Sequence, residues 1–542
     1  MKIASVGVSN FRGIAGTATL RLGKLTALIG PNGSGKTTFL LAIERFFSSE
    51  RKRMVKEDFN DTGSPITVTV VLCEEGQADR KITCEWKYDE GKQSVLSPKY
   101  RSGGQELSKP GNALGGISVV YVPAEHETDD DGEDKKNTLW QKMIDGALRG
   151  KAKLDDDKKA LQKKIETLYG KRLEEIRDRI NAKMSGKEGV GYAPNTRVSL
   201  KFAEPDVTMP TSLKVSDLDS EREVDHKYAG HGTKRAFYMS TLEVISEMSA
   251  DGSGGQPESS TVIVIDEPEL HQHPQRQKVL LKALQRLSKQ GSHQVVYSTH
   301  SPHFVTLKTP MSVRRVEREA GNVRVYDGKS LGEAQVRGRV IRAMEEAVFA
   351  NGVILVEGYT DEVILGSIFR KASHKGNNVM ETLIKNEVVV AECGGKPHIT
   401  QFCDVLDSLG IGRFVLWDGD LHQTKKKAIE NTRRLNEGIV ERLGLDPGFL
   451  DRLARSGDDG YVQDGDSVCF KFDGPTCLVG CFRRNHAKEL EADIVRGKDL
   501  DADLDLPTLE KTGFLGDVIP AIHARFAKRD GDTARKPARG AP

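Results

Sequence analysis

The sequence predicts an α/β protein, and three observations lead to this prediction. Short runs rich in β-branched residues recur along the 542 residues, and several are continuously apolar and end in Gly, Asp, Glu, Ser or Thr. Buried parallel strands have this pattern when polar chemistry lies at their carboxyl ends. A glycine-rich loop also stands between one such run and a helical pattern. At roughly 150 residues per domain, the length predicts three or four domains.

Composition limits the possible functions. The 81 Lys and Arg residues against 79 Asp and Glu leave a formal net charge of +2, so any nucleic-acid binding must come from a local patch. Seven cysteines form an odd and sparse set, which fits a reducing cytosol better than a disulfide scaffold. No apolar run approaches the roughly 18 residues of a membrane span. We therefore expect a soluble, cytoplasmic protein that makes no membrane contact.

Eight runs are expected to form strands, and one of them differs in pattern. The run at 66–72, ITVTVVL, alternates between apolar and polar residues, which predicts an antiparallel strand with one face exposed to water. The other expected strands are residues 25–30, 117–124, 261–268, 293–299, 352–358, 386–393 and 413–420.

A charged stretch from about 125 to 189 interrupts the strand pattern. Its apolar residues recur mostly at steps of three, four or seven, which predicts an amphipathic helix. These residues are Leu154, Leu161, Ile165, Leu168, Leu173, Ile176, Ile180 and Met184. The helix either lies on its own domain or forms an arm that contacts another subunit, and its charge pattern does not separate the two.

The segment 30–37, GPNGSGKT, matches the phosphate-binding pattern G-x-x-x-x-G-K-[ST] between a strand and a helix. Glycines let backbone N–H groups close around a β-phosphate, the lysine reaches the β and γ oxygens, and the threonine hydroxyl binds Mg²⁺. We therefore expect an ATP site in which Thr37 is also a metal ligand. Its residues are Asn32, Gly33, Gly35, Lys36, Thr37 and Thr38.

A pair of carboxylates, Asp266 and Glu267, ends the strand expected from Thr261 onward. Carboxylates at the exit of a buried strand are costly unless they serve a metal site. Asp266 is expected to hold Mg²⁺ through its water shell at the ATP site. Glu267 is expected to polarise the attacking water.

Further segments resemble ABC-type ATPases of the chromosome-maintenance and RecF-like kind. They are 265–274 for the Walker B motif and D-loop, 297–302 for the switch histidine, 3–13 for the first strand, and 230–235, GHGTKR, at the position of the signature motif, where the wording differs from LSGGQ. The resemblance implies that His300 senses the γ-phosphate. It also implies that Gly232 and Lys234 of one subunit complete the ATP site of another, in a homodimer or higher oligomer.

A second set of carboxylates stands at later strand ends. Glu357 ends one run, Asp361 follows at the start of an expected helix, and Asp418 and Asp420 flank Gly419 after another run. Such carboxylates repel one another, and divalent cations with oxygen ligands relieve the repulsion. One or two Mg²⁺ or Mn²⁺ ions held there can activate a water and stabilise a leaving oxygen at a phosphodiester. This acidic order resembles a Toprim domain, which has a Rossmann-like α/β fold.

An ABC-type ATPase followed by a Toprim domain is similar to the OLD (overcoming lysogenization defect) family of ATP-regulated endonucleases, which includes the nuclease subunit of the Gabija antiviral system. The likeness implies that Glu357, Asp361, Asp418 and Asp420 act as metal ligands or general base. Glu491 resembles the acidic position that completes a second metal site. The implied cofactors are ATP and Mg²⁺ or Mn²⁺, with one ion at the ATP site and one or two at the Toprim site.

The same likeness divides the chain into four parts. They are an ATPase domain at 1–310 with its helical insertion, linker helices at 311–350, a Toprim nuclease domain at 351–500 and a C-terminal segment at 501–542. DNA contact is expected from Lys425, Lys426 and Lys427, which follow the Toprim carboxylates closely, because phosphate must approach there.

The resulting hypothesis is a metal-dependent endonuclease that nicks or cuts double-stranded DNA, is gated by ATP and serves in defence against phage or mobile DNA. An alternative is an ATP-driven DNA-binding clamp or repair scaffold whose Toprim domain is not catalytic, although the intact acidic set argues against it. A Toprim RNase or topoisomerase is a third alternative. Gabija nucleases act with a helicase-like partner, and the sequence leaves open such a partner, the DNA preference and the direction of the ATP effect.

Overall fold

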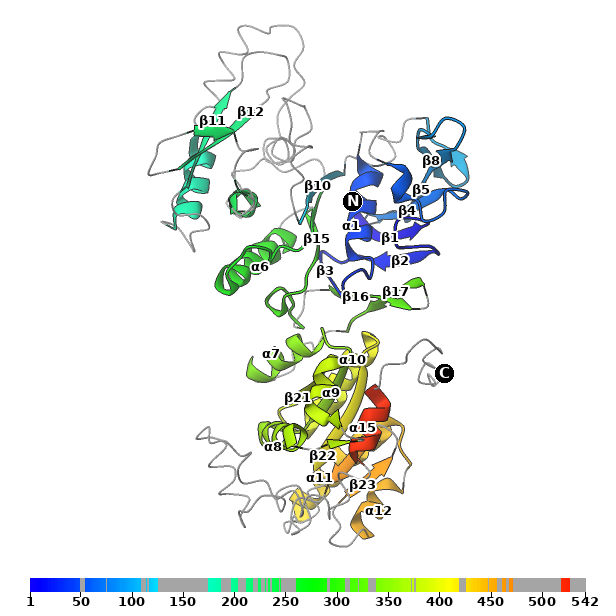
Figure 1. Ribbon diagram of the computed structural model, residues 1–542, viewed down its shortest axis with the longest axis vertical. Helices are drawn as coiled ribbons and strands as arrows, with labels where there is room; N and C mark the ends of the chain where they lie inside the picture. Colours follow the sequence, from blue (N-terminus) through cyan, green and yellow to red (C-terminus); the bar gives the residue numbers. More distant parts are fainter. Residues whose placement is uncertain are drawn as a thin grey trace. The chain divides into compact units, whose positions relative to one another are not determined.

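The computed structural model describes a large part of the chain, in two compact units. The units are Met1–Asp327 and Gly328–Pro542, and each is considered by itself (Figure 1). The described residues are 1–48, 54–74, 76–108, 114, 117–124, 174–186, 196–202, 211–217, 223–225, 230, 233, 236–242, 244, 260–289, 293–307, 312–319, 321–329, 338–371, 373–374, 377–418, 426–446, 448–455, 461–464, 467–470 and 518–526.

The first unit contains two six-stranded sheets. One has the order β2-β1-β4-β5-β8-β9 and is antiparallel throughout. Its strands are β1 (Lys2–Ser9), β2 (Ala18–Arg21), β4 (Ile66–Cys73), β5 (Arg80–Trp86), β8 (Lys99–Ser102) and β9 (Gln105–Glu106). The other has the order β10-β14-β15-β3-β16-β17 and is parallel except at β17. Its strands are β3 (Leu25–Ile29), β10 (Ser118–Val122), β14 (Thr261–Ile265), β15 (Gln294–Ser298), β16 (Ser312–Glu319) and β17 (Asn322–Asp327).

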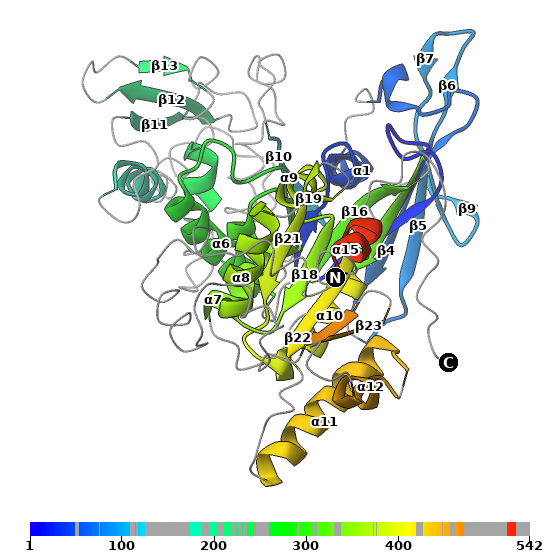
Figure 2. The same ribbon diagram turned by 60° about the horizontal axis from the view of Figure 1, so that its bottom comes forward.

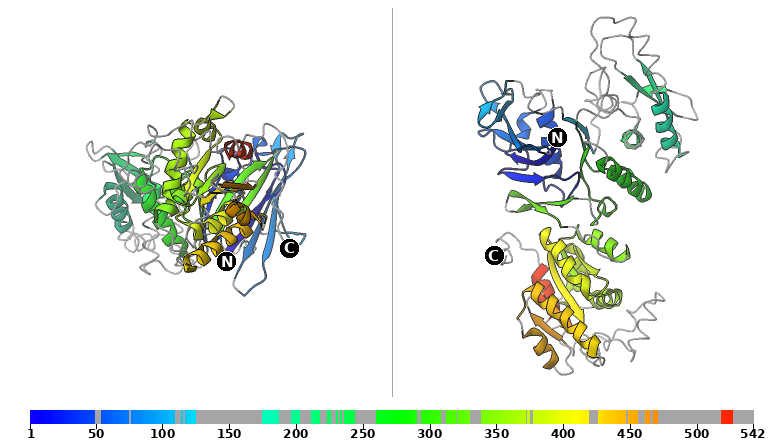
Figure 3. Two further views of the ribbon diagram at one scale, coloured as in Figure 1. Left: turned by 90° about the horizontal axis from the view of Figure 1, so that it is seen from below. Right: turned by 180° about the vertical axis from the view of Figure 1, so that it is seen from behind.

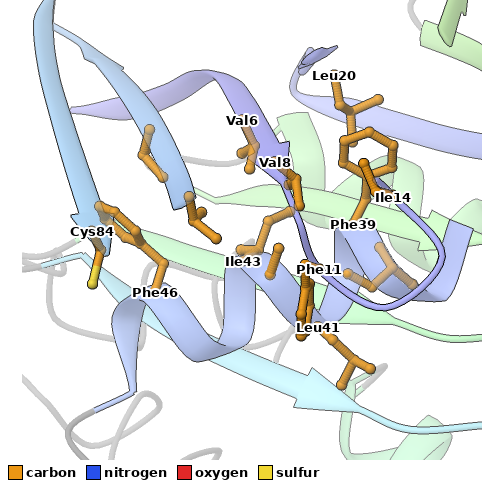
Figure 4. Close-up of a cluster of buried hydrophobic side chains, with 14 of the residues drawn as sticks. Val6, Val8, Phe11, Ile14, Leu20, Phe39, Leu41, Ile43, Phe46 and Cys84 are labelled. Atoms are coloured by element: carbon orange, nitrogen blue, oxygen red, sulfur yellow. The ribbon is translucent and has the colours of Figure 1, made fainter. Parts of the chain in front are cut away.

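Helix α1 (Lys36–Phe47) shares one buried cluster with both sheets. Its Phe39 and Ile43 lie with Val6 of β1 and with Val264 of β14 and Val296 of β15, and Figure 4 shows several of these side chains together. Helix α6 (Pro274–Lys289) contacts β15 and β3 of the parallel sheet. The core of this unit therefore holds the start of α1, which follows the phosphate-binding loop, against the parallel strands.

The eight strands expected from the sequence are all present in the structure, within one to three residues at their ends. Every residue of β3 is buried, whereas buried and partly exposed residues alternate along β4. This difference confirms that the apolar run at 25–30 is an interior strand of a parallel sheet. It also confirms that the alternating run at 66–72 is an antiparallel strand with one face more exposed to solvent than the other.

The range in which linker helices were expected, 311–350, begins too early. Residues 312–327 form β16 and β17, and β16 pairs with β3 inside the first unit. The sequence SVRRVERE conceals this strand because only Val313 and Val316 are apolar, and both are buried. Arg315 is buried as well, and its guanidinium lies 3.1 Å from the carboxylate of Glu317. Only α7 (Gly338–Ala347) is helical in the described part of that range.

The described part of the insertion contains the end of the expected amphipathic helix. Residues 174–185 are helical, and Ile176, Ile180 and Met184 are buried at steps of four. The side-chain amide of Asn181 donates to the carbonyl of Val198 at 2.9 Å and accepts from its N–H at 2.7 Å. This part of the helix therefore lies on its own unit, while 125–173 and 187–189 lie outside the described residues.

The described part of the first unit also contains smaller elements. A three-stranded antiparallel sheet has the order β11-β12-β13, and β6 and β7 form a two-stranded ribbon. Their bounds, with two short 3₁₀ turns, are β6 (Tyr88–Asp89), β7 (Ser94–Val95), β11 (Thr196–Phe202), β12 (Thr211–Asp217), β13 (Glu223–Asp225), η1 (Lys56–Asp58) and η3 (Pro302–Phe304).

The second unit is built on a five-stranded sheet of order β21-β18-β22-β24-β23, parallel except at β23 (Figure 2). Its strands are β18 (Gly352–Val356), β21 (Val388–Glu392), β22 (Gly412–Asp418), β23 (Tyr461–Asp464) and β24 (Ser467–Phe470), with the short pair β19 (Ser373–His374) and β20 (Asn377–Asn378). Its other described helices are α8 (Tyr359–Lys371), α9 (Val379–Lys385), α10 (Lys396–Ser408), α11 (Lys426–Leu443), α12 (Phe449–Arg455) and α15 (Ile519–Phe526).

Helices flank this sheet (Figure 3). Ile354 and Val356 of β18 lie in one buried cluster with residues of α8, α9 and α15. Successive residues of a strand face opposite sides, so the equally buried Val353 and Leu355 face the other side of the sheet. Both faces of β18 are therefore covered, so polar chemistry can occur only at the ends of this strand. Among the described helices none is both long and apolar enough to cross a membrane.

Candidate functional site

The phosphate-binding loop runs from the end of β3 to the first residue of α1. Gly30, Gly33 and Gly35 have φ angles of 137°, 71° and 111°, which favour glycine. A Cβ on Gly30 would lie 2.1 Å from the carbonyl oxygen of Val316 on β16. The loop therefore needs glycine here because the neighbouring strand passes so close. The N–H groups in the first turn of α1 have no partners within the helix, which suits them to bind an anion.

Lys36 is almost completely buried. Its ammonium group donates hydrogen bonds of 2.9 Å to the carbonyl oxygens of Gly30 and Pro31. Burial lowers the pKa of Lys36 to about 8, although the negative charges of Glu267 and Asp266 act in the opposite direction. Since an ammonium group has three donors, this lysine both braces the loop and keeps hydrogen-bonding capacity for a phosphate.

Asp266 lies beside the threonine expected to share a metal with it. Its Oδ1 accepts a hydrogen bond of 3.2 Å from Oγ1 of Thr37 and another from Oγ of Ser298. Asp266 is 4% exposed. A hydroxyl and a carboxylate are hard oxygen donors, and Mg²⁺ prefers such ligands. Thr37 and Asp266 therefore fit the Mg²⁺ of a bound nucleotide.

Glu267 and His300 also come together. The imidazole Nε2 lies 3.8 Å from Oε1 of Glu267. Burial and the charge of Lys36 lower the pKa of His300, so the neutral imidazole is favoured. Glu267 has a φ of 46°, which is uncommon outside glycine and often marks functional sites. Its N–H donates to Oγ of Ser298 at 3.0 Å.

The remaining expected ATP-binding residues have different positions. Asn32 and Gly33 are exposed at the tip of the loop, whereas Thr38 is buried in α1. Gly232 and Lys234, expected in the signature segment, lie outside the described residues. The structure therefore brings together Lys36, Thr37, Asp266, Glu267 and His300, and it does not describe the expected signature contacts.

The second acidic group lies at the carboxyl end of the central strands of the second unit. In the pairing of β18 with β22, Val356 lies opposite Leu416. Glu357 follows β18, and Asp418 is the last residue of β22. Asp361 is in the first turn of α8, and its Oδ2 accepts a hydrogen bond of 2.9 Å from the N–H of Gly358. The topology therefore directs Glu357, Asp361 and the end of β22 to one edge.

Other expected residues of this group are only partly described. The side chain of Asp418 and all of Asp420, Lys425 and Glu491 lie outside the described residues. Lys426 begins α11, and Lys427 is exposed in its first turn. Among the side chains that the structure describes, no group of three or more His, Cys, Asp or Glu could hold a metal ion. Carboxylates from two neighbouring strand ends are nonetheless a donor set that suits Mg²⁺ or Mn²⁺.

Lys396 is a residue of this edge that the sequence did not reveal. It is the first residue of α10, is 4% exposed, and its Nζ lies 3.7 Å from Oε2 of Glu357. The N–H of Gly395 also donates to the backbone carbonyl of Glu357 at 2.8 Å. The turn after β21 therefore places a positive charge beside the acidic edge.

Ser298 and Glu269 were also missed in the first unit. Ser298 follows Tyr297, which lies opposite Ile265 in the parallel pairing of β15 with β14, so Ser298 and Asp266 are the next residues of adjacent strands. Recognising either residue requires the order of strands in the sheet, and a single sequence does not give that order. For Lys396 the available signal was the run GGK directly after an expected strand.

Two family models match successive parts of the chain. A family model described as AAA ATPase domain matches residues 1–101 and 112–305, more than half of the chain. A second, described as Overcoming lysogenization defect protein-like, TOPRIM domain, matches residues 348–420. The predicted fold class, a P-loop ATPase domain followed by a Toprim domain, is thereby confirmed. So is the resemblance to the OLD family.

Three relatives match large parts of the chain. The OLD nuclease of Thermus scotoductus is 27% identical over 467 residues, covering 79% of this chain and 84% of the relative. The Old nuclease of Escherichia phage P2 is 25% identical over 466 residues, covering 78% and 77%. The Septu protein PtuA of Bacillus thuringiensis is 25% identical over 309 residues, covering 54% of this chain and 71% of that protein.

Solved structures that match part of this chain include an SMC head bound to the C-winged helix domain of ScpA and a RecF recombination mediator. The SMC head has a TM-score of 0.39 at 14% identity and covers 60% of this chain and 97% of its own. The RecF structure has a TM-score of 0.38 at 14% identity and covers 60% and 98%.

Proposed function

Because the chain belongs to the AAA ATPase domain family and joins that domain to an OLD-like Toprim domain, we propose that it is an ATP-regulated, divalent-metal-dependent DNA endonuclease. The observation that carries this proposal is the pairing of β18 with β22, which directs Glu357 and Asp418 to the same edge of a parallel sheet. Acidic residues on adjacent strand ends can hold the divalent ions that a metal-dependent phosphodiesterase uses.

At the Toprim edge, Glu357, Asp361, Asp418 and Asp420 would hold Mg²⁺ or Mn²⁺, and Glu491 would complete a second ion site. The bound ion would activate water and stabilise the leaving oxygen of a phosphodiester. Lys425, Lys426 and Lys427 would neutralise DNA phosphates, so that binding weakens as salt rises.

In the ATPase domain, each residue near the loop has a distinct task. Lys36 would bind the β and γ phosphates, while Thr37 and Asp266 would hold Mg²⁺. Glu267 would accept a proton from the attacking water, and a neutral His300 would donate a hydrogen bond to the γ-phosphate.

Gly232 and Lys234 would act across a homodimer, whose formation ATP would favour. Light scattering tests this last point: ATP should double the mass of the wild type but not of Lys36→Ala, and a monomer under both conditions would contradict it.

A biological role in antiphage or anti-mobile-element defence is part of the proposal. Two relatives that are named as nucleases support the cleavage on which such a role would depend. A helicase-like partner is compatible with the proposed activity, since such a partner could supply unwound or strained DNA as substrate.

Cleavage of supercoiled plasmid tests the nuclease directly. Wild type is incubated with Mg²⁺, with Mn²⁺ and with a chelator, beside Asp418→Ala, Glu357→Ala and the control Glu437→Ala, whose side chain is exposed on α11 and pairs with Arg433. We expect nicked or linear product from wild type and control only with metal, and none from the two acidic-edge variants. A protein that binds the plasmid but never cuts it would instead be the ATP-driven clamp.

A further inference from the structure

A carboxylate three residues beyond Asp266 connects the Walker B end of β14 to the segment that carries the switch histidine. Glu269 accepts a hydrogen bond of 2.9 Å at Oε2 from the hydroxyl of Thr299. It accepts another of 2.6 Å at Oε1 from the backbone N–H of His300. Both carboxylate oxygens are therefore directed at two consecutive residues after β15. Hydrogen bonds to a charged acceptor are stronger than neutral ones.

A second connection holds the same segment from α6. The hydroxyl of Ser301 donates to Oε1 of Gln277 at 2.6 Å, and the amide of Gln277 donates to the carbonyl of Gln272 at 2.9 Å. The N–H of Ser301 also donates to the hydroxyl of Thr299 at 3.0 Å. The three residues 299–301 are thus fixed by side chains that come from the chain just after the Walker B motif.

The position of His300 depends on these contacts. Its imidazole is partly exposed and lies 3.8 Å from Glu267, whereas its backbone is tied to Glu269. Glu269 is only partly buried, yet burial raises its pKa, with the hydrogen bonds from His300 and Thr299 opposing this shift. Removing a carboxylate from water is unfavourable unless other interactions compensate. The hydrogen bond that fixes the backbone of His300 is one such interaction.

We propose that Glu269 is a positioning residue for ATP hydrolysis, which holds the backbone of His300 so that its imidazole faces Glu267 and the γ-phosphate. This inference rests on the proposed ATPase function. It differs from a role in the chemistry itself, because the hydrogen bonds of Glu269 with the switch segment go to a backbone N–H and to the hydroxyl of Thr299. Glutamine keeps a carbonyl oxygen that can accept the bond from His300, whereas alanine keeps none.

The test compares Glu269→Ala, Glu269→Gln and wild type. The matched control is Glu85→Ala, a partly buried glutamate of β5 in the same unit that pairs with Arg101 at 3.4 Å. Steady-state ATP hydrolysis gives kcat and KM, and amide hydrogen exchange reports on residues 299–301. Misplacement of a catalytic group by about 1 Å can cost roughly 100-fold in rate. We expect Glu269→Ala to lower kcat about 10- to 100-fold, with KM within about threefold, and to speed exchange at 299–301.

Glu269→Gln is expected to retain most of the wild-type kcat and slow exchange at 299–301, and Glu85→Ala to change neither. The inference is overturned if Glu269→Gln is as inactive as Glu269→Ala, since Glu269 would then take part in the chemistry. It is also overturned if exchange at 299–301 in Glu269→Ala equals that of wild type. A wild type that hydrolyses no ATP would count against the proposed function, whereas the exchange measurement judges the anchoring of the segment separately.

Discussion

At the residue scale, the phosphate-binding loop depends on the space around one glycine. Gly30 has a φ of 137°, and a Cβ there would lie 2.1 Å from the carbonyl oxygen of Val316. Gly33 also has a positive φ, of 71°, but no atom lies within 4 Å of its Cβ position. A side chain at Gly33 would therefore introduce backbone strain alone, whereas one at Gly30 would introduce both strain and a steric clash.

This difference predicts unequal effects of two alanine substitutions. Gly30→Ala should destabilise the first unit by about 3 kcal/mol or more, because strain and overlap act together, and should abolish ATP binding. Gly33→Ala should cost only roughly 1–2 kcal/mol from strain. Thermal melting and calorimetric titration with ATP measure both effects. Equal losses for the two variants would show that the collision with Val316 does not matter.

The sequence alone predicts much of the candidate ATP site. The motif spacing identified Lys36, Thr37 and Asp266, and the structure brings them together with Glu267 and His300. A motif can identify these residues because binding phosphate and metal requires particular kinds of side chain at these positions. Ser298, Glu269 and Lys396 were not predicted. Their importance depends on the order of the strands in the sheet, which no local sequence pattern reveals.

At the element scale, the sequence predicts strands better than it predicts domain edges. The eight expected strands are present because continuous or alternating apolar residues fix their burial. The strand β16 was missed because five of its eight residues, SVRRVERE, are arginine or glutamate beside two buried valines, and arginine can be buried when it is paired. The boundary of the first unit therefore lies at Asp327 and not at 310.

An ion cluster fixes α10 to its neighbours in the second unit. Asp407 of α10 accepts hydrogen bonds from Arg413 of β22 at 2.8 and 3.1 Å. It accepts another from Arg442 of α11 at 3.0 Å. Burial of Asp407 would raise its pKa, but these two arginines outweigh burial and hold the pKa below its ordinary value. The carboxylate therefore joins a helix, a strand and a second helix.

The lowered pKa predicts the pH dependence of stability. A carboxyl group whose pKa is lower in the folded state stabilises the fold fully above its unfolded pKa of about 3.9, and this contribution is lost as pH falls through the folded pKa. Asp407→Asn should therefore lower the urea midpoint at pH 7 but converge with wild type under more acid conditions.

The control for this prediction is Glu437→Gln, which removes an exposed pair with Arg433 on α11. Exposed pairs contribute about 0–1 kcal/mol, so this variant should follow wild type at every pH. A gap between Asp407→Asn and wild type that stayed constant down to pH 3 would contradict the account of Asp407.

At the scale of the whole molecule, two chemical centres occur in one chain. The near-zero net charge gave no sign of nucleic-acid binding, yet acidic groups gather at the ends of β14 and β18 while lysines begin α11. Their order along the chain was predictable from motifs, and it is the order of the matched AAA ATPase and Toprim domains. A local sequence pattern does not give the direction of the proposed ATP effect, because that direction depends on the relative free energies of two states.

The central claim is that ATP binding at Lys36 regulates cleavage at the Toprim carboxylates, and the rate of plasmid cleavage with and without ATP tests it most directly. In the presence of Mg²⁺, ATP should change the wild-type rate roughly fivefold or more, in the range usual for coupled sites. Lys36→Ala should cut at one rate under both conditions, and Asp418→Ala should not cut in either. A wild-type rate that is indifferent to ATP, or a Lys36→Ala rate that responds as wild type does, would contradict the account.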